Sequence, residues 1–146
     1  MRIIRKGSHT KYELKYHFAW ITKYRYPVLQ GKIALRVRAL VRMLCAEHDV
    51  IILSGRVVPT HVHIFVSAPP NLAPAKLIQY VKGATSRKIQ QEFPELKKRY
   101  WGQHFWARGY FVASSGTITD ETILEYFKHH DEQDNEDDFK IARFGL

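Results

Sequence analysis

Residues 50–67 read VIILSGRVVPTHVHIFVS. β-Branched residues fill the first half and a Pro-Thr pair breaks the run, so we predict a strand over 50–58, a turn, and a second strand over 61–67. In the second strand His61 and His63 leave one face of the extended chain, and the apolar residues between and after them leave the other. This alternation predicts a strand with one face in a core and two imidazoles on the opposite face.

Taken alone, the His-x-His pair is open to two interpretations. It is typical of a half-exposed strand with polar residues on its solvent-exposed face, and it is also typical of a metal site. The remainder of the chain is needed to choose between them.

Five further elements can be placed around these two strands. Alternation predicts one strand, the FWARGYFVAS sequence is interpreted as another, apolar residues at helical spacing predict two helices, and Thr119 as a helix N-cap predicts a third helix. The predicted ranges are a strand over 12–21, a helix over 32–48, a helix from Pro74 to about Phe93, a strand over 105–114, and a helix from Thr119 to about Gln133.

The resulting order is β-α-β-β-α-β-α. Four strands and two covering helices in this order predict an α+β fold, a ferredoxin-like (RRM-like) split βαβ sandwich with a four-stranded antiparallel sheet. The first and third strands are central in that topology, so His61 and His63 are expected in mid-sheet, on the face away from the helices. The C-terminal helix is surplus to the sandwich.

The length and composition predict one domain. The chain has 146 residues, 45% of them hydrophobic, and no apolar run approaches the roughly 20 residues of a membrane span. We therefore expect a single domain over 1–146, with a core over about 11–133 and a tail over 134–146. Cys45 is the only cysteine, and its helical spacing to Leu44 and Val41 predicts a buried core thiol in a cytoplasmic protein.

The charge is strongly uneven along the chain. Residues 1–130 carry 21 basic and 8 acidic residues, a formal charge of +13, and the last 16 residues carry −4. A body this basic, with aromatic residues among the charges, favours nucleic acid as the partner over a merely soluble basic protein.

Two helical faces carry residues of functional interest. In the helix that begins at Pro74, basic and aromatic residues fall on one outer face; in the C-terminal helix, Tyr126 and His130 lie one turn apart and can point at the same spot. Tyr126 could also be an ordinary amphipathic-helix residue, and His130 a solvated residue at a helix end. The residues expected to contact DNA are Lys23, Arg25, Lys76, Tyr80, Lys82 and Arg87.

Five blocks in order resemble one family. YHFAWITKYR, VVPTHVHIFV, YVKGATSRKI, WGQHFWARGYFVASSG and ILEYFKHH together look like the small single-tyrosine HUH transposases of single-strand insertion sequences, from about Lys11 to Gln133. The resemblance implies that His61 and His63 bind a divalent metal, Mg²⁺ or Mn²⁺, and that Tyr126 is the nucleophile. It also implies a homodimer that exchanges its tyrosine helices, which would account for the surplus helix.

One position departs from the family pattern. Four residues after the tyrosine the family usually has glutamine as the third metal ligand, and here that residue is His130. Histidine is a competent ligand, so the site is expected to survive with an altered metal preference.

The implied activity is cleavage and rejoining of single-stranded or hairpin DNA through a covalent 5′-phosphotyrosine, which conserves the phosphodiester energy. Three alternatives remain at this point: an HUH replication-initiator or relaxase-like nuclease, a non-catalytic RRM-like nucleic-acid-binding module, and a structural zinc site. The absence of a cysteine pair disfavours the zinc site.

Overall fold

Four strands form one antiparallel sheet in the spatial order β4-β5-β3-β6. In this computed structural model the described residues are 4–98, 104–114 and 125. The four strands are β3 (Lys15–Ile21), β4 (Ile51–Val58), β5 (His61–Ser67) and β6 (Phe111–Ala113). The first and third strands of the predicted sandwich, β3 and β5, are therefore central, as the ferredoxin-like topology requires.

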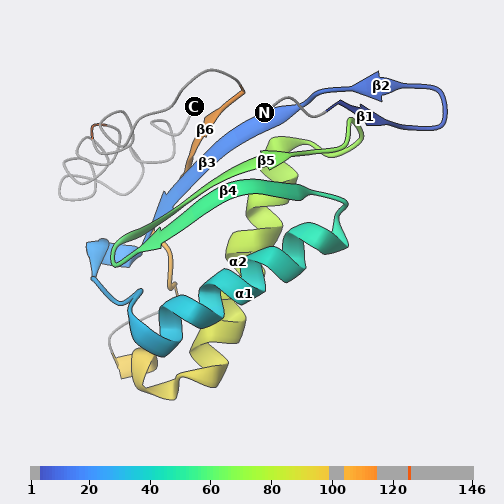
Figure 1. Ribbon diagram of the computed structural model, residues 1–146. Helices are drawn as coiled ribbons and strands as arrows, with labels where there is room; N and C mark the ends of the chain where they lie inside the picture. Colours follow the sequence, from blue (N-terminus) through green and yellow to red (C-terminus); the bar gives the residue numbers. More distant parts are fainter. Residues whose placement is uncertain (1–3, 99–103, 115–124, 126–146) are drawn as a thin grey trace.

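Two helices cover one face of this sheet, as Figure 1 shows. They are α1 (Gly31–Glu47) and α2 (Pro74–Glu92), with short 3₁₀ turns η1 (Lys23–Arg25) after β3 and η2 (Pro94–Lys98) after α2. The predicted α+β sandwich is confirmed. Both helices and the two strands of the 50–67 hairpin match their predicted ranges to within one residue at each end.

The main core fills the space between the helices and the sheet. Alternate residues of β3 and β5 point into it, and the inner sides of both helices meet them, because apolar periods of 2 and 3.6 present continuous apolar faces. Its fully buried members include Phe18, Trp20, Val66, Val37, Leu40, Val81 and Ile89. Trp20 packs edge-on against Trp106, with ring centroids 5.8 Å apart.

The predicted position of Cys45 in this core is also confirmed. The thiol is free and buried in α1, and burial raises its pKa to about 11. A thiol in this state is protonated at neutral pH and packs as a small apolar side chain.

The last strand is shorter than predicted. We predicted a strand over 105–114, and only Phe111–Ala113 pairs with β3 as a ladder. Gly109 has a φ of +80°, which ends the extended conformation, and before it only an isolated bridge joins Trp106 to Thr22. Phe105 and Trp106 instead turn into the core, where both are buried.

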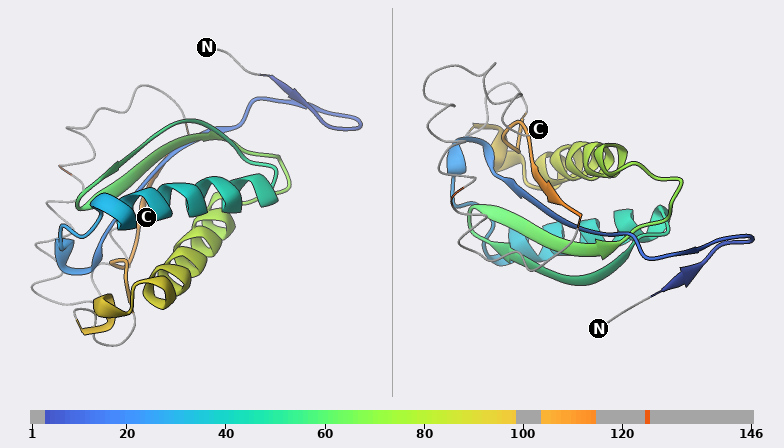
Figure 2. Two further views of the ribbon diagram at one scale, coloured as in Figure 1. Left: turned by 60° about the horizontal axis from the view of Figure 1, so that its bottom comes forward. Right: turned by 90° about the horizontal axis from the view of Figure 1, so that it is seen from above.

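The N-terminal residues form a hairpin that the sequence did not reveal. Strands β1 (Arg5–Lys6) and β2 (Lys11–Tyr12) pair with each other alone and project from the sheet, as both views in Figure 2 show. The Arg5 guanidinium anchors this hairpin by donating to the Asp49 carboxylate at 2.7 Å and to the Ser67 carbonyl at 3.1 Å.

The predicted C-terminal helix from Thr119 to Gln133 and the acidic tail lie outside the described residues, apart from Glu125, which is helical and exposed.

Candidate functional site

The two histidines of the HVH sequence lie on the outer face of the sheet. In the register of β5, His61 is opposite Ile21 and His63 is opposite Ala19 on β3, while Val62 and Ile64 are buried in the main core. Both imidazoles are partly exposed. The strand therefore places two nitrogen donors on the face away from the helices, at the position that alternation predicted.

A third histidine, His17, joins them from β3. Its Nδ1 lies 3.3 Å from Nε2 of His63, and its ring is stacked on Phe65, with centroids 4.2 Å apart and planes 19° apart. The sequence analysis did not link His17 to the pair. The link depends on the β3–β5 register, in which the residue opposite His63 is Ala19, two positions from His17.

His61 has a different neighbour. The Thr60 hydroxyl oxygen lies 3.3 Å from its Nδ1. If Nδ1 carries the proton and donates a hydrogen bond to this hydroxyl, Nε2 carries the lone pair with which His61 can bind a metal, which is how neighbouring groups commonly fix the tautomer of a ligating histidine.

The described residues do not complete a metal centre by themselves. Within 4–98, 104–114 and 125, no three His, Cys, Asp or Glu side chains group together as a metal site. Tyr126 and His130 lie outside these ranges. Imidazole nitrogens are nevertheless suitable donors for manganese, cobalt or zinc, so the histidines present fit the implied metal as part of its ligand set.

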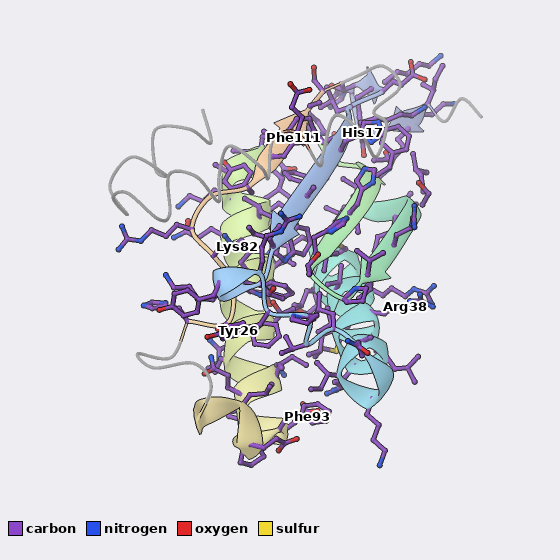
Figure 3. All side chains as sticks on the ribbon, turned by 90° about the vertical axis from the view of Figure 1, so that its left-hand side faces the viewer. His17, Tyr26, Arg38, Lys82, Phe93 and Phe111 are labelled. Atoms are coloured by element: carbon purple, nitrogen blue, oxygen red, sulfur yellow. The ribbon has the colours of Figure 1, made fainter. Side chains whose placement is uncertain are left out.

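The β6 side of the outer face is apolar. Ala19, Ile21 and Ala107 are buried there and Phe111 packs against them. Figure 3 shows His17 and Phe111 near each other on this face. The histidines thus border a small second core and are not surrounded by solvent.

The residues expected to contact DNA lie in several places. Lys76 and Arg87 are exposed on α2, while Lys23 and Arg25 are partly exposed in η1, where the Lys23 ammonium lies 5.2 Å from the centre of the Tyr24 ring. The Tyr80 hydroxyl donates to Glu47 at 2.7 Å, which raises the pKa of Tyr80. The Tyr80 ring is exposed and lies 4.2 Å, centroid to centroid, from His48.

Lys82 is placed differently from our expectation. Its ammonium donates to the carbonyls of Ala107 and Gly109 at 2.9 and 2.7 Å, and burial lowers its pKa to about 8. It lies between α2 and the segment that precedes β6 (Figure 3). These contacts assign Lys82 to the packing of the sheet's edge, and we remove it from the proposed DNA-binding set.

A basic cleft that sequence reasoning did not select lies beside β4. Its volume is about 170 Å³, and Arg38 and Arg42, one turn apart on α1, line it together with Arg56 on β4. Arg38 and Arg42 are exposed and have no ion pair within the described part of the chain. Figure 3 shows Arg38 extending outward from α1. The only signal in the sequence was the presence of arginines away from the apolar stripe of that helix.

Comparison with known proteins defines the class. Residues 10–130 match a family described as IS200-like transposase. The chain is therefore a transposase, a DNA-processing enzyme. Within that class, it belongs to the IS200-like transposase family.

Individual relatives agree with this assignment. The ISDra2 transposase TnpA of Deinococcus radiodurans is 31% identical over 131 residues, 89% of this chain and 94% of the relative. The transposase for insertion sequence element IS200 of Salmonella typhimurium is 33% identical over 127 residues, 87% of this chain and 83% of the relative.

Two solved structures share the fold. A crystal structure at 1.90 Å resolution, described as that of a putative transposase from Deinococcus radiodurans R1, has a TM-score of 0.75 at 29% identity and covers 88% of this chain and 97% of its own. A REP-associated tyrosine transposase bound to a REP hairpin has a TM-score of 0.53 at 12% identity, covering 90% and 75%. Neither helix of the described residues is long and apolar enough to cross a membrane.

Proposed function

We propose that this chain cleaves and rejoins single-stranded DNA at the ends of an insertion sequence, with Tyr126 as the nucleophile. The observation that carries the proposal is the placement of His61 and His63 on the outer face of a central strand, in a chain of the IS200-like transposase family. An open sheet face with two nitrogen donors offers an accessible place for a DNA phosphate next to a divalent ion.

In the proposed reaction, the Tyr126 phenol oxygen attacks the scissile phosphorus and the bond from phosphorus to the 3′ oxygen breaks. The phenol proton passes to solvent, and the departing 3′ oxygen takes up a proton to become a free hydroxyl. The 5′ phosphate remains as an ester of Tyr126, so a later attack by another 3′-hydroxyl rejoins DNA without an external energy source.

His61, His63 and His130 are the proposed metal ligands. A bound divalent ion would polarise the scissile phosphate and stabilise charge on the leaving oxygen. The role of the histidines is to hold that ion at the sheet face with positions open to the phosphate. The role of His130 rests on its position four residues after Tyr126, where the family usually has a glutamine ligand.

The proposed substrate is single-stranded or hairpin DNA. The DNA backbone would follow basic groups at the surface, namely Lys23, Arg25, Lys76 and Arg87 together with the cleft arginines. The exposed ring of Tyr80 offers a surface on which a base can stack. The REP-bound neighbour is a transposase on a hairpin, and its likeness to this chain is one of fold.

We also propose that the active form is a homodimer with exchanged tyrosine helices. Each site would then combine the histidines of one protomer with Tyr126 of its partner.

The nucleophile is tested with labelled single-stranded DNA that carries the insertion-sequence end. The wild-type chain should form an adduct that survives denaturation when the label is on the fragment to the 3′ side of the cut, because the 5′ phosphate of that fragment stays on the tyrosine. Tyr126→Phe should form none and still bind the DNA within a few-fold, since only the hydroxyl is lost. An adduct in the Phe variant would remove Tyr126 from this role.

A further inference from the structure

The turn η1 holds an exposed aromatic ring on an unfavourable backbone conformation. Tyr24 is 56% exposed and has a φ of +59°, and Arg25 after it has a φ of +52°. This left-handed region is routine only for glycine, and of the described residues other than glycine only Asp49 shares it. Residues with side chains keep such a conformation where the surrounding structure fixes it, and they are concentrated at binding and catalytic sites.

Thr22 fixes the backbone of this turn. It is fully buried, and its hydroxyl donates to the Tyr26 carbonyl at 2.7 Å and lies 3.3 Å from the Thr60 carbonyl oxygen. The Arg25 amide donates to the Thr22 carbonyl at 3.0 Å. These hydrogen bonds tie both ends of η1 to the body of the protein, so the Tyr24 ring stands on a fixed support.

The Tyr24 ring is part of a small aromatic and basic surface. Its centroid lies 5.4 Å from that of Tyr26, with the planes tilted by 52°, and 5.2 Å from the Lys23 ammonium. Tyr26 in turn packs against the main core. A tyrosine supported in this way offers a flat surface and loses little rotamer freedom on binding. An aromatic ring with cations beside it is the combination that binds single-stranded nucleic acid.

This surface lies at the His61 end of the candidate site. Ile21, the last residue of β3, pairs with His61, and the Thr22 amide donates to the Thr60 carbonyl at 3.0 Å. Figure 1 shows η1 beside the turn that joins β4 to β5. Tyr24 is three residues past Ile21, so their Cα atoms are at most about 11 Å apart. A DNA strand with its scissile phosphate at the histidines would therefore have a nearby nucleotide within reach of this ring.

We propose that Tyr24 is a base-stacking residue, whose ring receives one unpaired base near the scissile phosphate while Lys23 and Arg25 contact the adjoining backbone. This role rests on the proposed function, in which single-stranded DNA is held at the histidines. It adds a contact to a base beside the expected contacts to phosphates. Because every base has a π-face, such a contact positions the strand with little preference for its sequence.

The first test measures binding of the full chain to single-stranded DNA that carries the insertion-sequence end, in EDTA so that the DNA stays uncut. Tyr24→Ala should weaken binding by about 5- to 100-fold, the range for loss of one stacked base, and Tyr24→Phe by less than about twofold because it keeps the ring. The matched control is Tyr12→Ala, since Tyr12 also has a cation near its ring, the Arg5 guanidinium at 5.4 Å from the centroid. It should bind as the wild type does.

A set of DNA strands, each lacking one base at a different position, then identifies the stacked base. One of these strands should bind the wild type at least about fivefold more weakly than intact DNA does, and should bind Tyr24→Ala within about twofold of intact DNA, because the contact is already lost there. Equal effects of every missing base on both chains would overturn the inference. Unchanged DNA binding by Tyr24→Ala, with loss of dimer in analytical ultracentrifugation, would assign the ring to a protein contact and also overturn it.

Tyr24→Gly separates base stacking from a structural role. Glycine adopts a positive φ without strain, so this variant should melt at or above the wild-type temperature while binding DNA as weakly as Tyr24→Ala. A lower melting temperature with wild-type DNA affinity would overturn the inference. The glycine variant also serves in the missing-base experiment if Tyr24→Ala does not fold.

The adduct assay keeps this inference distinct from the function on which it rests. Adduct formation by the wild type with no base coupled to Tyr24 would overturn only the stacking role. A base coupled to Tyr24 in a chain that forms no adduct would overturn the proposed chemistry and leave the stacking role supported.

Discussion

Arg56 on β4 lies directly opposite His63 on β5 in the antiparallel ladder. Side chains at paired positions leave the same face of a sheet, so the guanidinium of Arg56 and the imidazole of His63 share the outer face. Arg56 also lines the cleft that contains Arg38 and Arg42. Arg56 is therefore next to the outer face, where the proposed chemistry lies, and also next to a positively charged cleft on the helix side of β4.

This arrangement predicts that the cleft binds DNA phosphates. Replacing Arg38 and Arg42 by glutamine should weaken binding of single-stranded DNA and reduce the slope of log affinity against log salt by about 1.4, the value for two lost phosphate contacts on a single strand. Fluorescence anisotropy over a series of salt concentrations measures both. The control removes the same charge from the N-terminal hairpin with Lys6→Gln and Lys11→Gln. An equal loss in both double variants would show a general charge effect and no role for the cleft.

The proposed exchange of tyrosine helices predicts complementation between two inactive chains. A His61→Ala, His63→Ala chain lacks the metal ligands and a Tyr126→Phe chain lacks the nucleophile, but a heterodimer with exchanged helices contains one site with both. Co-expressed heterodimers should form the covalent DNA adduct, at up to about half the wild-type level because one of two sites is intact. Adduct formation no higher than in either parent would indicate a site built within one protomer.

Lys82 predicts a pH dependence of stability. Its pKa is 10.5 as a free side chain and about 8 in the folded protein, because burial penalises the charged form. Between these values the unfolded chain holds a proton that the folded chain has lost, so unfolding takes up a proton and the free energy of unfolding rises with pH. Relative to Lys82→Met, the free energy of unfolding of the wild type should increase by up to about 3 kcal/mol from pH 8 to pH 10.5.

Urea unfolding of the wild-type and Lys82→Met chains at several pH values measures this difference. Other groups, Cys45 among them, titrate in both chains and cancel. A constant difference between the two chains across this range would mean that the ammonium is solvated in the folded protein. A difference that shrinks as pH rises would contradict the assigned direction of the pKa.

We predict that the hydrogen bonds of the Thr85 hydroxyl make a measurable contribution to the free energy of unfolding. In the core it accepts the indole N–H of Trp106 at 2.8 Å and donates to the Val81 carbonyl at 2.7 Å. Thr85→Val has nearly the same shape but leaves the buried indole donor without its acceptor, which should cost about 1–3 kcal/mol in the free energy of unfolding. Thr85→Ser keeps the hydroxyl and should restore most of this. Equal destabilisation by both substitutions would assign the effect to packing.

Strong periodicity made most of the fold predictable. The helix α2 has Ile78, Val81, Thr85 and Ile89 on its buried side, as helical spacing predicted, and β5 runs from His61 to Ser67 as its alternation predicted. The end of the sheet was not predictable in the same way. FWARGYFVAS has strand-like composition throughout, and the left-handed φ of Gly109 lies between the isolated Thr22–Trp106 bridge and the β3–β6 ladder.

The site was predictable only where it lies within one element. His61 and His63 are neighbours along one strand, so local alternation was enough to place them on a common face. The contact between His17 and His63 depends on which residues of β3 and β5 stand opposite each other, and the cleft depends on how α1 lies against β4. Lys82 looked like a surface lysine because helical spacing cannot show that the 107–109 segment passes over it.

The buried thiol of Cys45 provides a built-in probe of unfolding. Nucleophilic attack on a maleimide or a disulfide reagent requires an accessible thiolate, and the folded chain provides little of it at neutral pH. Modification of this residue should then proceed through opening of the core, so its rate reports how often α1 separates from the sheet. Because the chain has no other cysteine, a fluorophore or spin label attached to a cysteine introduced at an exposed position would mark that position alone while the protein stays folded.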